Sequence, residues 1–413
     1  MSIIVKKFGG TSVGTVERIE AVAERIASSV RQGEQPVLTA SAMSGETNRL
    51  VDLANQVDSS YRGPSYDMLV ASGEQVSIAL LSMALAKRDI KTKPLLAYQL
   101  GIQTDSIFAK ARIKAVNGKA LVDLANDNVV PIVAGFQGVN ENQDITTLGR
   151  GGSDTTAVAL AAAIGQELNG RCACEIYTDV PAVFTADPRL VKKAKPIERL
   201  AYEEMMEMSS LGSKILHVRC VEMAAKYQVP VHVRSSFETL DGTWIDEEER
   251  MENPVVSAVT HEGNTAIFKL FPVPFGPGFL AQLFEGLADK GVVVDIITQS
   301  QNDEGQRLAF SVTSEDVPLA EQYIAQNLST DTRLEIMKNM AKLSIVGVGM
   351  KNHPGVASRF FSCLDRLNVP LHLVTTSEIK LSAVVDGVDL EKAAVAIHTE
   401  FALDKAADSD ASS

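Results

Sequence analysis

Short apolar runs alternate with longer amphipathic stretches through residues 1–245 of the chain. The apolar run Val129–Phe136 is bounded by turn residues and predicts a buried strand, whereas apolar positions in Val16–Arg31 recur at helical spacing. Strands that alternate with helices predict a layered α/β domain with a largely parallel sheet. The other expected strands are Ser2–Lys7, Pro36–Ser41, Cys174–Thr178 and Val229–Val233, and the other expected helices are Asn48–Val57, Tyr66–Lys87 and Thr155–Leu168.

The pattern changes around residues 238–254. The charge run Asp246–Arg250 leads to Pro254 and indicates a solvent-exposed turn or helix end, so we place a domain boundary nearby. Residues 403–413 are small and polar and predict a disordered tail. The sequence therefore predicts one α/β domain over 1–245 and two smaller modules over 263–335 and 336–402.

The last third of the chain contains an internal repeat. Pro277-Gly278 matches Pro354-Gly355 at an offset of 77, since 354 − 277 = 77. Each copy has the pattern strand, Pro-Gly turn, amphipathic helix, strand, which predicts two small α+β modules packed side by side. The same offset relates Phe284 to Phe361, Leu287 to Leu364, Val292 to Val369 and Ser300 to Ser377.

Composition narrows the class of protein. The chain has 413 residues, which suggests two to three domains, and 45% apolar and 22% charged residues, as in a soluble globular protein. A net charge of −13 disfavours nucleic acid and anionic membranes as main partners. No apolar run reaches the roughly 18–20 residues that a membrane span needs. The four cysteines form no CxxC pair, so we expect buried thiols, no bound metal ion and a cytoplasmic location.

The first candidate motif, Lys7–Ser12, joins a predicted strand to a predicted helix. Gly9 and Gly10 allow the backbone to approach an anion, the helix N-terminus offers free N–H groups, and Lys7 adds a positive charge. The glycine spacing, with Gly14 as the next one, fits neither a Walker A loop nor a dinucleotide-binding fingerprint. The segment therefore predicts an anion site, and a tight strand-to-helix turn is the alternative.

Three further loops follow predicted strands. Ser41–Asn48 is rich in small residues and hydroxyls, and Thr146–Thr156 contains Arg150, which can hold a carboxylate or phosphate through two parallel N–H bonds. Tyr177–Arg189 could hold a nucleotide. Helix caps at Thr47, Asn48 and Asp154, and a plain turn at Asp187-Pro188, are the competing interpretations. Ligands of open α/β sheets bind at the carboxyl ends of strands, where these loops would converge.

Together these segments resemble the aspartate kinases of the amino-acid kinase superfamily. The resemblance covers residues 2–402 and includes Gly73-Glu74, and the Pro-Gly repeats resemble the paired ACT modules of those enzymes, with Thr376–Lys380 in the typical place. It implies an amino-acid kinase fold over 1–245, followed by two ferredoxin-like α+β ACT modules. The chain resembles the monofunctional enzymes, which lack a fused homoserine dehydrogenase.

The resemblance also implies an activity. The expected reaction is ATP-dependent phosphorylation of the L-aspartate β-carboxylate, the first step of lysine, threonine and methionine biosynthesis. ATP would bind with Mg²⁺, held mainly through the ATP phosphates. Lysine, threonine or both would inhibit by feedback through the ACT modules, which would also join the chain into a homodimer or a larger homo-oligomer.

Roles for individual residues follow from the same resemblance. Lys7 would contact the transferring phosphoryl group and be oriented by Asp154, and Arg150 and Glu74 would hold the α-carboxylate and ammonium of aspartate. The remaining assignments are Gly9 and Gly10 as backbone donors to phosphate, Ser41, Thr47 and Ser153 in the aspartate pocket, Thr178, Asp179, Arg189 and Lys214 facing the nucleotide and its phosphates, and Gly278, Asp295 and Gln299 in the effector site.

The sequence departs from the family at three positions, and two rival functions remain. Val218 replaces a usual proline after His217, Ala182 lies in a loop that could pack on adenine, and Phe275 stands where an acid is frequent. One rival is another amino-acid kinase, acting on glutamate or acetylglutamate. The other is a catalytically idle sensor of lysine or threonine, which the combined presence of the four residues Lys7, Glu74, Arg150 and Asp154 disfavours.

Overall fold

The computed structural model describes residues 3–212, 215–247, 254–274, 276–302, 305–328 and 331–405. These residues form two compact units, each described by itself below. The first unit contains the described residues up to 183, 196–210 and 215–247. The second contains 184–195, 211–212 and the described residues from 254 onward.

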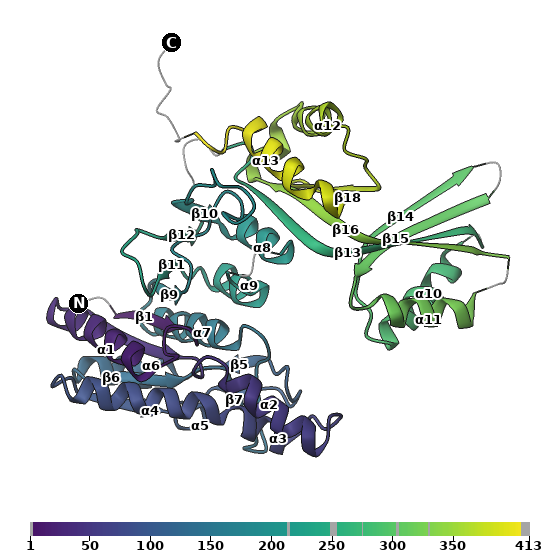
Figure 1. The fold of residues 1–413 in the computed structure, drawn as a ribbon. Coiled ribbons are helices and arrows are strands. Elements are labelled where there is room, and N and C mark those ends of the chain that lie inside the picture. Colours follow the sequence, from purple (N-terminus) through teal and green to yellow (C-terminus); the bar gives the residue numbers. More distant parts are fainter. Residues whose placement is uncertain are drawn as a thin grey trace, which may run out of the picture. The chain divides into compact units, whose positions relative to one another are not determined.

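An eight-stranded sheet forms the centre of the first unit (Figure 1). Six of its strands are parallel, which confirms the predicted α/β class, and only β12 and β10 run the opposite way. The strand order is β10 (Arg199–Ala201), β12 (Thr243–Asp246), β11 (Val231–Ser235), β9 (Cys174–Thr178), β1 (Ile3–Phe8), β2 (Gln35–Ala40), β6 (Val130–Ala134) and β3 (Thr92–Leu95).

Helices cover both faces of this sheet. On one face, α1 (Val16–Arg31) and α4 (Ser72–Ala86) share an apolar core with β1, β2 and β6. On the other face lie α6 (Gly118–Asn126) and the Ala-rich α7 (Gly152–Glu167), which contacts β1, β2 and β9. A side chain at Gly118 would lie 2.4 Å from the carbonyl oxygen of Ala163, so glycine lets α6 and α7 approach closely. α8 (Tyr202–Ser210) and α9 (Val218–Tyr227) complete the layer.

A second, smaller sheet lies beside the loops that follow the main strands. Its order is β5 (Ile113–Ala115), β4 (Gln103–Thr104), β7 (Gln137–Val139) and β8 (Ile145–Thr147). The neighbouring helices are α2 (Glu46–Val57), α3 (Pro64–Val70) and α5 (Ala97–Leu100). The sequence pattern did not predict this sheet, because its strands are only two or three residues long.

One helical stretch, Pro64–Ala86, is long and apolar enough to span a membrane by length and composition alone. The chain bends at Ala71, which separates α3 from α4, where the sequence predicted one helix over Tyr66–Lys87. Half of the stretch is buried, and it contains the buried acids Asp67 and Glu74. The stretch is therefore a core element of the first unit.

The second unit is built on one six-stranded antiparallel sheet. Its order is β14 (Val294–Asn302), β15 (Gly305–Thr313), β13 (Ala258–Val273), β16 (Arg333–Val346), β18 (Lys380–Asp386) and β17 (Leu373–Thr376). Its helices are α10 (Pro277–Asp289), α11 (Val317–Asn327), α12 (Val356–Arg366) and α13 (Leu390–Glu400), with the short 3-10 helices η1 (Val348–Asn352) and η2 (Gly387–Asp389).

The internal repeat is confirmed as two copies of a strand–helix–strand unit, β13–α10–β14 and β16–α12–β17. One apolar core gathers around α10 and α11, and a separate one around α12 and α13. β13 and β16 pair along almost their whole length, so both strands pass through both cores. The N-terminal part of β13 pairs with the part of β16 that enters the second core, so no single cut in the sequence separates the two modules.

Candidate active site

Five loops of the first unit begin at one edge of the main sheet. They follow β1, β2, β6, β9 and β11, which are parallel and adjacent. Backbone contacts tie them together, since Gly9 N–H donates to the Tyr177 carbonyl and Ser41 N–H donates to the Phe8 carbonyl. Ser12 and Ser236 are joined by a 2.5 Å hydrogen bond between their hydroxyls. This edge is the place where the sequence predicted that the motifs would converge.

A lysine and an aspartate meet at the centre of this edge. Lys7 Nζ at the end of β1 lies 2.5 Å from Asp154 Oδ1 in the first turn of α7, and their side chains are only 10% and 13% exposed. Phe8, the next residue, points into the core on the opposite face. Alternation along the strand thus directs Lys7 toward α7, where it carries a fixed positive charge at a partly accessible point.

The loop after β1 leaves no room for side chains. A Cβ atom at Gly10 would lie 2.9 Å from the Ala42 carbonyl oxygen, and one at Gly9 would lie 3.3 Å from Lys7 Nζ. Neither glycine has a left-handed conformation, so close approach, not backbone strain, explains them. The Gly9 N–H already donates to the Tyr177 carbonyl, so of the predicted pair of donors the Gly10 N–H is the one that has no hydrogen bond among the described residues.

Glu74 is the most deeply buried acid of the predicted set. It is 2% exposed and accepts a 3.0 Å hydrogen bond from the Ala42 N–H through Oε1. Oε2 has no hydrogen-bond partner among the described residues. Burial raises the pKa of Glu74 to about 8, although the Ala42 N–H lowers it. The site thus holds a carboxyl group with one unused oxygen, which suits a cationic ligand group.

The loop that contains Arg150 is shaped by glycines with positive φ. Gly149 and Gly151 have φ of 77° and 71°, and a Cβ at Gly151 would clash with the His217 side chain. Phe136, at φ 68°, packs beneath Gly152. Arg150 itself is exposed and forms no hydrogen bond or ion pair within the described ranges. The loop therefore presents a guanidinium to a ligand.

Two groups that sequence analysis missed, the buried Asp67 and the half-buried Arg219, hold this loop in place. Both carboxylate oxygens of Asp67 accept from the Ala109 N–H at 3.0 Å, and Oδ2 also accepts from the Thr147 N–H at 2.6 Å. Arg219 donates to the Leu148 carbonyl at 2.6 Å and to the Ala111 carbonyl at 2.9 Å. Burial raises the pKa of Asp67 despite its N–H donors. No local motif signals these contacts, because every partner is a distant backbone group.

The departure at Val218 has a visible effect. His217 is the N-cap residue of α9, and its ring Nδ1 accepts from the Arg219 N–H at 3.4 Å. Val218 is the first residue of the helix, a position at which proline is also favourable. Arg219 follows in the first turn and reaches the Arg150 loop. The local helix start is therefore kept. Phe275 lies outside the described residues, and Ala182 is fully buried.

The other predicted residues are more scattered. Thr178 donates to Asp179 Oδ1 at 3.1 Å beyond β9, and Ser153 is buried against Gly135. Thr47 is half-buried in the first turn of α2. Arg189 is 90% exposed, pairs with Asp187 at 2.7 Å and belongs to the second unit, and Lys214 lies outside the described residues.

The cysteine thiols are shielded from solvent by burial. All four, Cys172, Cys174, Cys220 and Cys363, are free and buried, as expected. Burial raises the pKa of the Cys174 and Cys220 thiols well above the usual value, and the nearby Asp154 carboxylate raises both further. They stay protonated, so they do not act as nucleophiles.

The predicted effector residues lie in the second unit. Gly278 is at the start of α10 with open space beside it, and Asp295 and Gln299 are exposed positions of β14. Asp295 Oδ2 is 2.5 Å from Lys342 Nζ, and Glu262 binds the same ammonium at 2.9 Å. The Asp295 carboxylate therefore already has an internal cationic partner.

Comparison with known proteins agrees with this architecture. Residues 2–235 match the family model of the amino acid kinase family, and residues 343–401 match a model of the ACT domain. The chain is 46% identical to an aspartate kinase of Stutzerimonas stutzeri and 44% identical to aspartokinase 2 of Bacillus subtilis, over 98% of this chain and 98% and 99% of theirs.

Two solved structures of E. coli aspartokinase III are also similar. One is a complex with aspartate and ADP, with 26% identity and a TM-score of 0.75, and the other a complex with lysine and aspartate, with 27% identity and a TM-score of 0.78. Each match covers 97% of this chain and 99% of the other. On this combined identity, coverage and domain content, the chain belongs to the aspartate kinases, within the amino acid kinase family.

Proposed function

We propose that the chain transfers the γ-phosphoryl group of ATP to the β-carboxylate of L-aspartate at the edge formed by β1, β2 and β9. The observation that carries this proposal is the Lys7–Asp154 ion pair beside the crowded Gly9-Gly10 backbone. An ammonium held beside the Gly10 N–H, which has no hydrogen bond among the described residues, suits a phosphoryl group in transfer. The similarity to a relative crystallised with aspartate and ADP supports the same assignment.

Charge repulsion is the main obstacle to this reaction. The nucleophile is already an anionic carboxylate, so the reaction requires no strong general base. Two unit charges about 4 Å apart repel by about 1 kcal/mol in water and by several-fold more in a partly dry site. Lys7 offsets this repulsion at the transferring group, and Asp154 fixes the position of the ammonium.

Magnesium fits this site through the nucleotide. No group of three or more His, Cys, Asp or Glu side chains that could hold a metal occurs in the described part of the chain. Mg²⁺ bound to the ATP phosphates would neutralise part of their charge. The protein residues then contribute positioning, through Lys7 and the backbone of Gly9 and Gly10.

Recognition of aspartate is assigned to two charged groups and three hydroxyls. Arg150 would bind the α-carboxylate through two N–H bonds, since its side chain is exposed at a loop held by Arg219. Glu74 would bind the ammonium with its unused oxygen. The hydroxyls assigned to the same pocket are those of Ser41, Thr47 and Ser153.

The nucleotide is assigned to the loop after β9. Thr178 and Asp179 lie at the end of that strand, next to the Gly9 loop, and would face the nucleoside. Arg189 and Lys214 complete the nucleotide assignment, with Lys214 also assigned to the phosphates.

Regulation is assigned to the second unit. Lysine, threonine or both would bind near Gly278, Asp295 and Gln299, and the relative crystallised with lysine supports an amino-acid effector. The ammonium of the effector would compete with Lys342 for Asp295, which gives bound and free states different contacts. A homodimer or larger assembly through the ACT modules and a cytoplasmic location complete the proposal.

The test is the initial rate of ATP consumption by the full chain with L-aspartate, with L-glutamate as the control, repeated with lysine, threonine and both. We expect turnover that depends on aspartate and falls with at least one effector. Turnover with glutamate instead would indicate another amino-acid kinase. No turnover, together with a melting temperature raised by lysine or threonine, would indicate a sensor and refute the proposal.

A further inference from the structure

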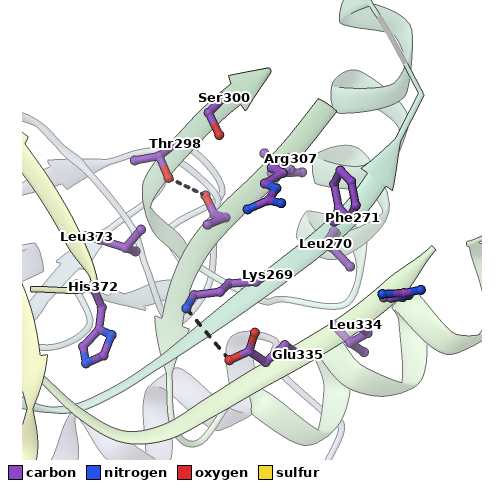
Figure 2. A pocket seen from close by; sticks show the side chains of 13 residues that line it. Lys269, Leu270, Phe271, Thr298, Ser300, Arg307, Leu334, Glu335, His372 and Leu373 are labelled. Carbon is purple, nitrogen blue, oxygen red and sulfur yellow. Dashed lines mark hydrogen bonds and ion pairs between the residues drawn. The ribbon is translucent and has the colours of Figure 1, made fainter. Parts of the chain in front are cut away.

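The second unit contains a cavity of about 510 Å³ that the kinase reaction does not use. It lies over β14, β15, β13 and β16, with His372 and Leu373 at one side (Figure 2). None of the predicted effector residues Gly278, Asp295 and Gln299 lines it. A volume of this size is typical of small-molecule sites, which span about 300–1,000 Å³.

Strand register builds the cavity floor from two rows of side chains. In one row Ser300 pairs with Arg307, and Phe271 pairs with Arg333 on the next strand. In the other row Lys269 lies between Ala309 and Glu335. Because side chains alternate along a strand, the neighbouring Phe268 and Phe310 face the opposite side and pack in the core around α10 and α11.

The lining is cationic. Among the described residues that line the cavity, Lys269, Arg307 and Arg333 are accompanied by one carboxylate, Glu335, whose oxygen is 3.9 Å from Lys269 Nζ. This excess of positive groups contrasts with the net charge of −13 of the whole chain. Thr298 and Ser300 add hydroxyl groups at the β14 side. The cavity is thus complementary in charge to an anion.

One guanidinium is already oriented. The central carbon of the Arg307 guanidinium lies over the Phe271 ring, 4.7 Å from the ring centroid. The two side chains are neighbours in Figure 2. Phe271 and Arg333 are directly paired, so the ring stands between the two strands that supply the arginines. Planar guanidinium groups bind phosphate and carboxylate oxygens through paired N–H bonds. Stacking reduces the motion that Arg307 would lose on binding.

From this arrangement we propose that the cavity binds a small polyanion, with its phosphate or carboxylate groups held by Arg307, Arg333 and Lys269 over the face of Phe271. The ligand class is a metabolite with at least two anionic groups. The site lies on the sheet face opposite α10 and α11, apart from the residues assigned to aspartate, nucleotide and effector. The proposal does not depend on the kinase assignment.

The experiment is calorimetric titration of the full chain with pyrophosphate and, separately, with citrate, in the presence of saturating ADP to fill the nucleotide site. We expect at least one probe to bind, with a Kd that rises as salt is added. Binding of pyrophosphate alone identifies a phosphate site, and binding of citrate alone identifies a carboxylate site.

Matched variants locate the binding. Lys269→Gln and Arg333→Gln should each raise the Kd of the probe at least tenfold. Lys290→Gln should leave the Kd unchanged, because Lys290 is exposed at the end of α10. Circular dichroism and melting temperature check that each variant folds. The proposal is overturned if neither probe binds, or if both cavity variants bind as the wild type does. The proposal is also overturned if the cavity variants sediment differently from the wild type and still bind the probes with unchanged Kd. A second copy of the chain would then cover the cavity.

Discussion

Two buried lysines, one in each unit, form ion pairs of the same length in different surroundings. Lys7 Nζ is 2.5 Å from Asp154, and Lys342 Nζ is 2.5 Å from Asp295. Lys7 ends a strand beside a crowded glycine loop, whereas Lys342 lies within β16 and binds Glu262 as well. An ion pair alone therefore does not indicate catalysis. What distinguishes Lys7 is the nearby Gly10 N–H, which has no hydrogen bond among the described residues and to which we assign a second anion.

The electrostatics of Lys342 support this distinction. Burial alone would lower its pKa, but hydrogen bonds to Asp295 and Glu262 outweigh burial and raise it. Lys342 thus stays charged because it is paired with both Glu262 and Asp295. These two ion pairs join β16 to β13, which carries Glu262, and to β14, which carries Asp295. We therefore assign Lys342 a structural and regulatory role, and Lys7 the contact with substrate.

The largest expected effect is at Lys7. We expect Lys7→Ala to lower kcat for aspartate-dependent ATP consumption about 100- to 1,000-fold in a protein that remains folded, as loss of one preorganised charge does elsewhere. Lys6→Ala is the matched control, because Lys6 faces the other side of β1 and binds Glu34 and Glu175. It should cost about 3 kcal/mol of stability and leave kcat of the folded enzyme intact. Near wild-type kcat in Lys7→Ala contradicts the account.

The next effect concerns the loop that carries Arg150. Arg219→Gln removes charged donors to the Leu148 and Ala111 carbonyls, and we expect KM for aspartate to rise about tenfold. The kcat at saturating aspartate should change less than threefold, since Arg219 positions the loop and touches no substrate. Arg219→Lys should restore part of the affinity. Equal losses of kcat in both variants would show that Arg219 has a direct role instead.

A smaller effect is expected in the second unit. Lys342→Met leaves Asp295 and Glu262 without their shared cation, and because Asp295 is half-exposed we expect a loss of only about 1–2 kcal/mol. Turnover without effector should be unchanged. Lys338→Met, at an exposed position of the same strand, is the control. Chemical denaturation measures the free energy of unfolding of both variants. Equal stability of the two variants would contradict the stabilising role that we assign to Lys342.

The smallest effect is a change in pH dependence. The pKa of Glu74 is raised to about 8 from an ordinary value of 4.5, so the folded state binds this proton more tightly than the unfolded state. Its contribution to stability is full below pH 4.5 and is lost as pH rises through 8. Relative to Glu74→Gln, the wild-type melting temperature should therefore fall by at least about 2 °C between pH 5 and 8.5. If the melting temperatures of the wild type and of Glu74→Gln changed with pH in the same way, the assigned burial of Glu74 would be contradicted.

Much of the first unit could be predicted because its signals are local. The helix Val16–Arg31 and the strand Cys174–Thr178 have the predicted bounds, and the loops after β1, β2 and β9 begin at the common edge because parallel strands align their ends. Arg189, at the end of the last predicted motif, belongs to the second unit. The contacts of Asp67 and Arg219 could not be predicted. Their partners are backbone groups 42 to 108 residues away in sequence, which carry no side-chain signal.

The cavity of the second unit was not predictable for a related reason. Its cations come from three antiparallel strands, and only the register places Lys269, Arg307 and Arg333 together. The bulges between β13 and β16 change which side chains face one another, and sequence does not reveal them. The repeat predicted the modules, but the passage of both long strands through both cores appears only in the structure.

The measurement that tests the division between the two units most directly is the initial rate of the wild type and of Asp295→Asn, each titrated with whichever of lysine and threonine inhibits the wild type. The account predicts the same uninhibited kcat in both proteins and at least a tenfold higher inhibitory concentration in the variant. A variant that loses turnover without effector, or that is inhibited as readily as the wild type, would contradict the account.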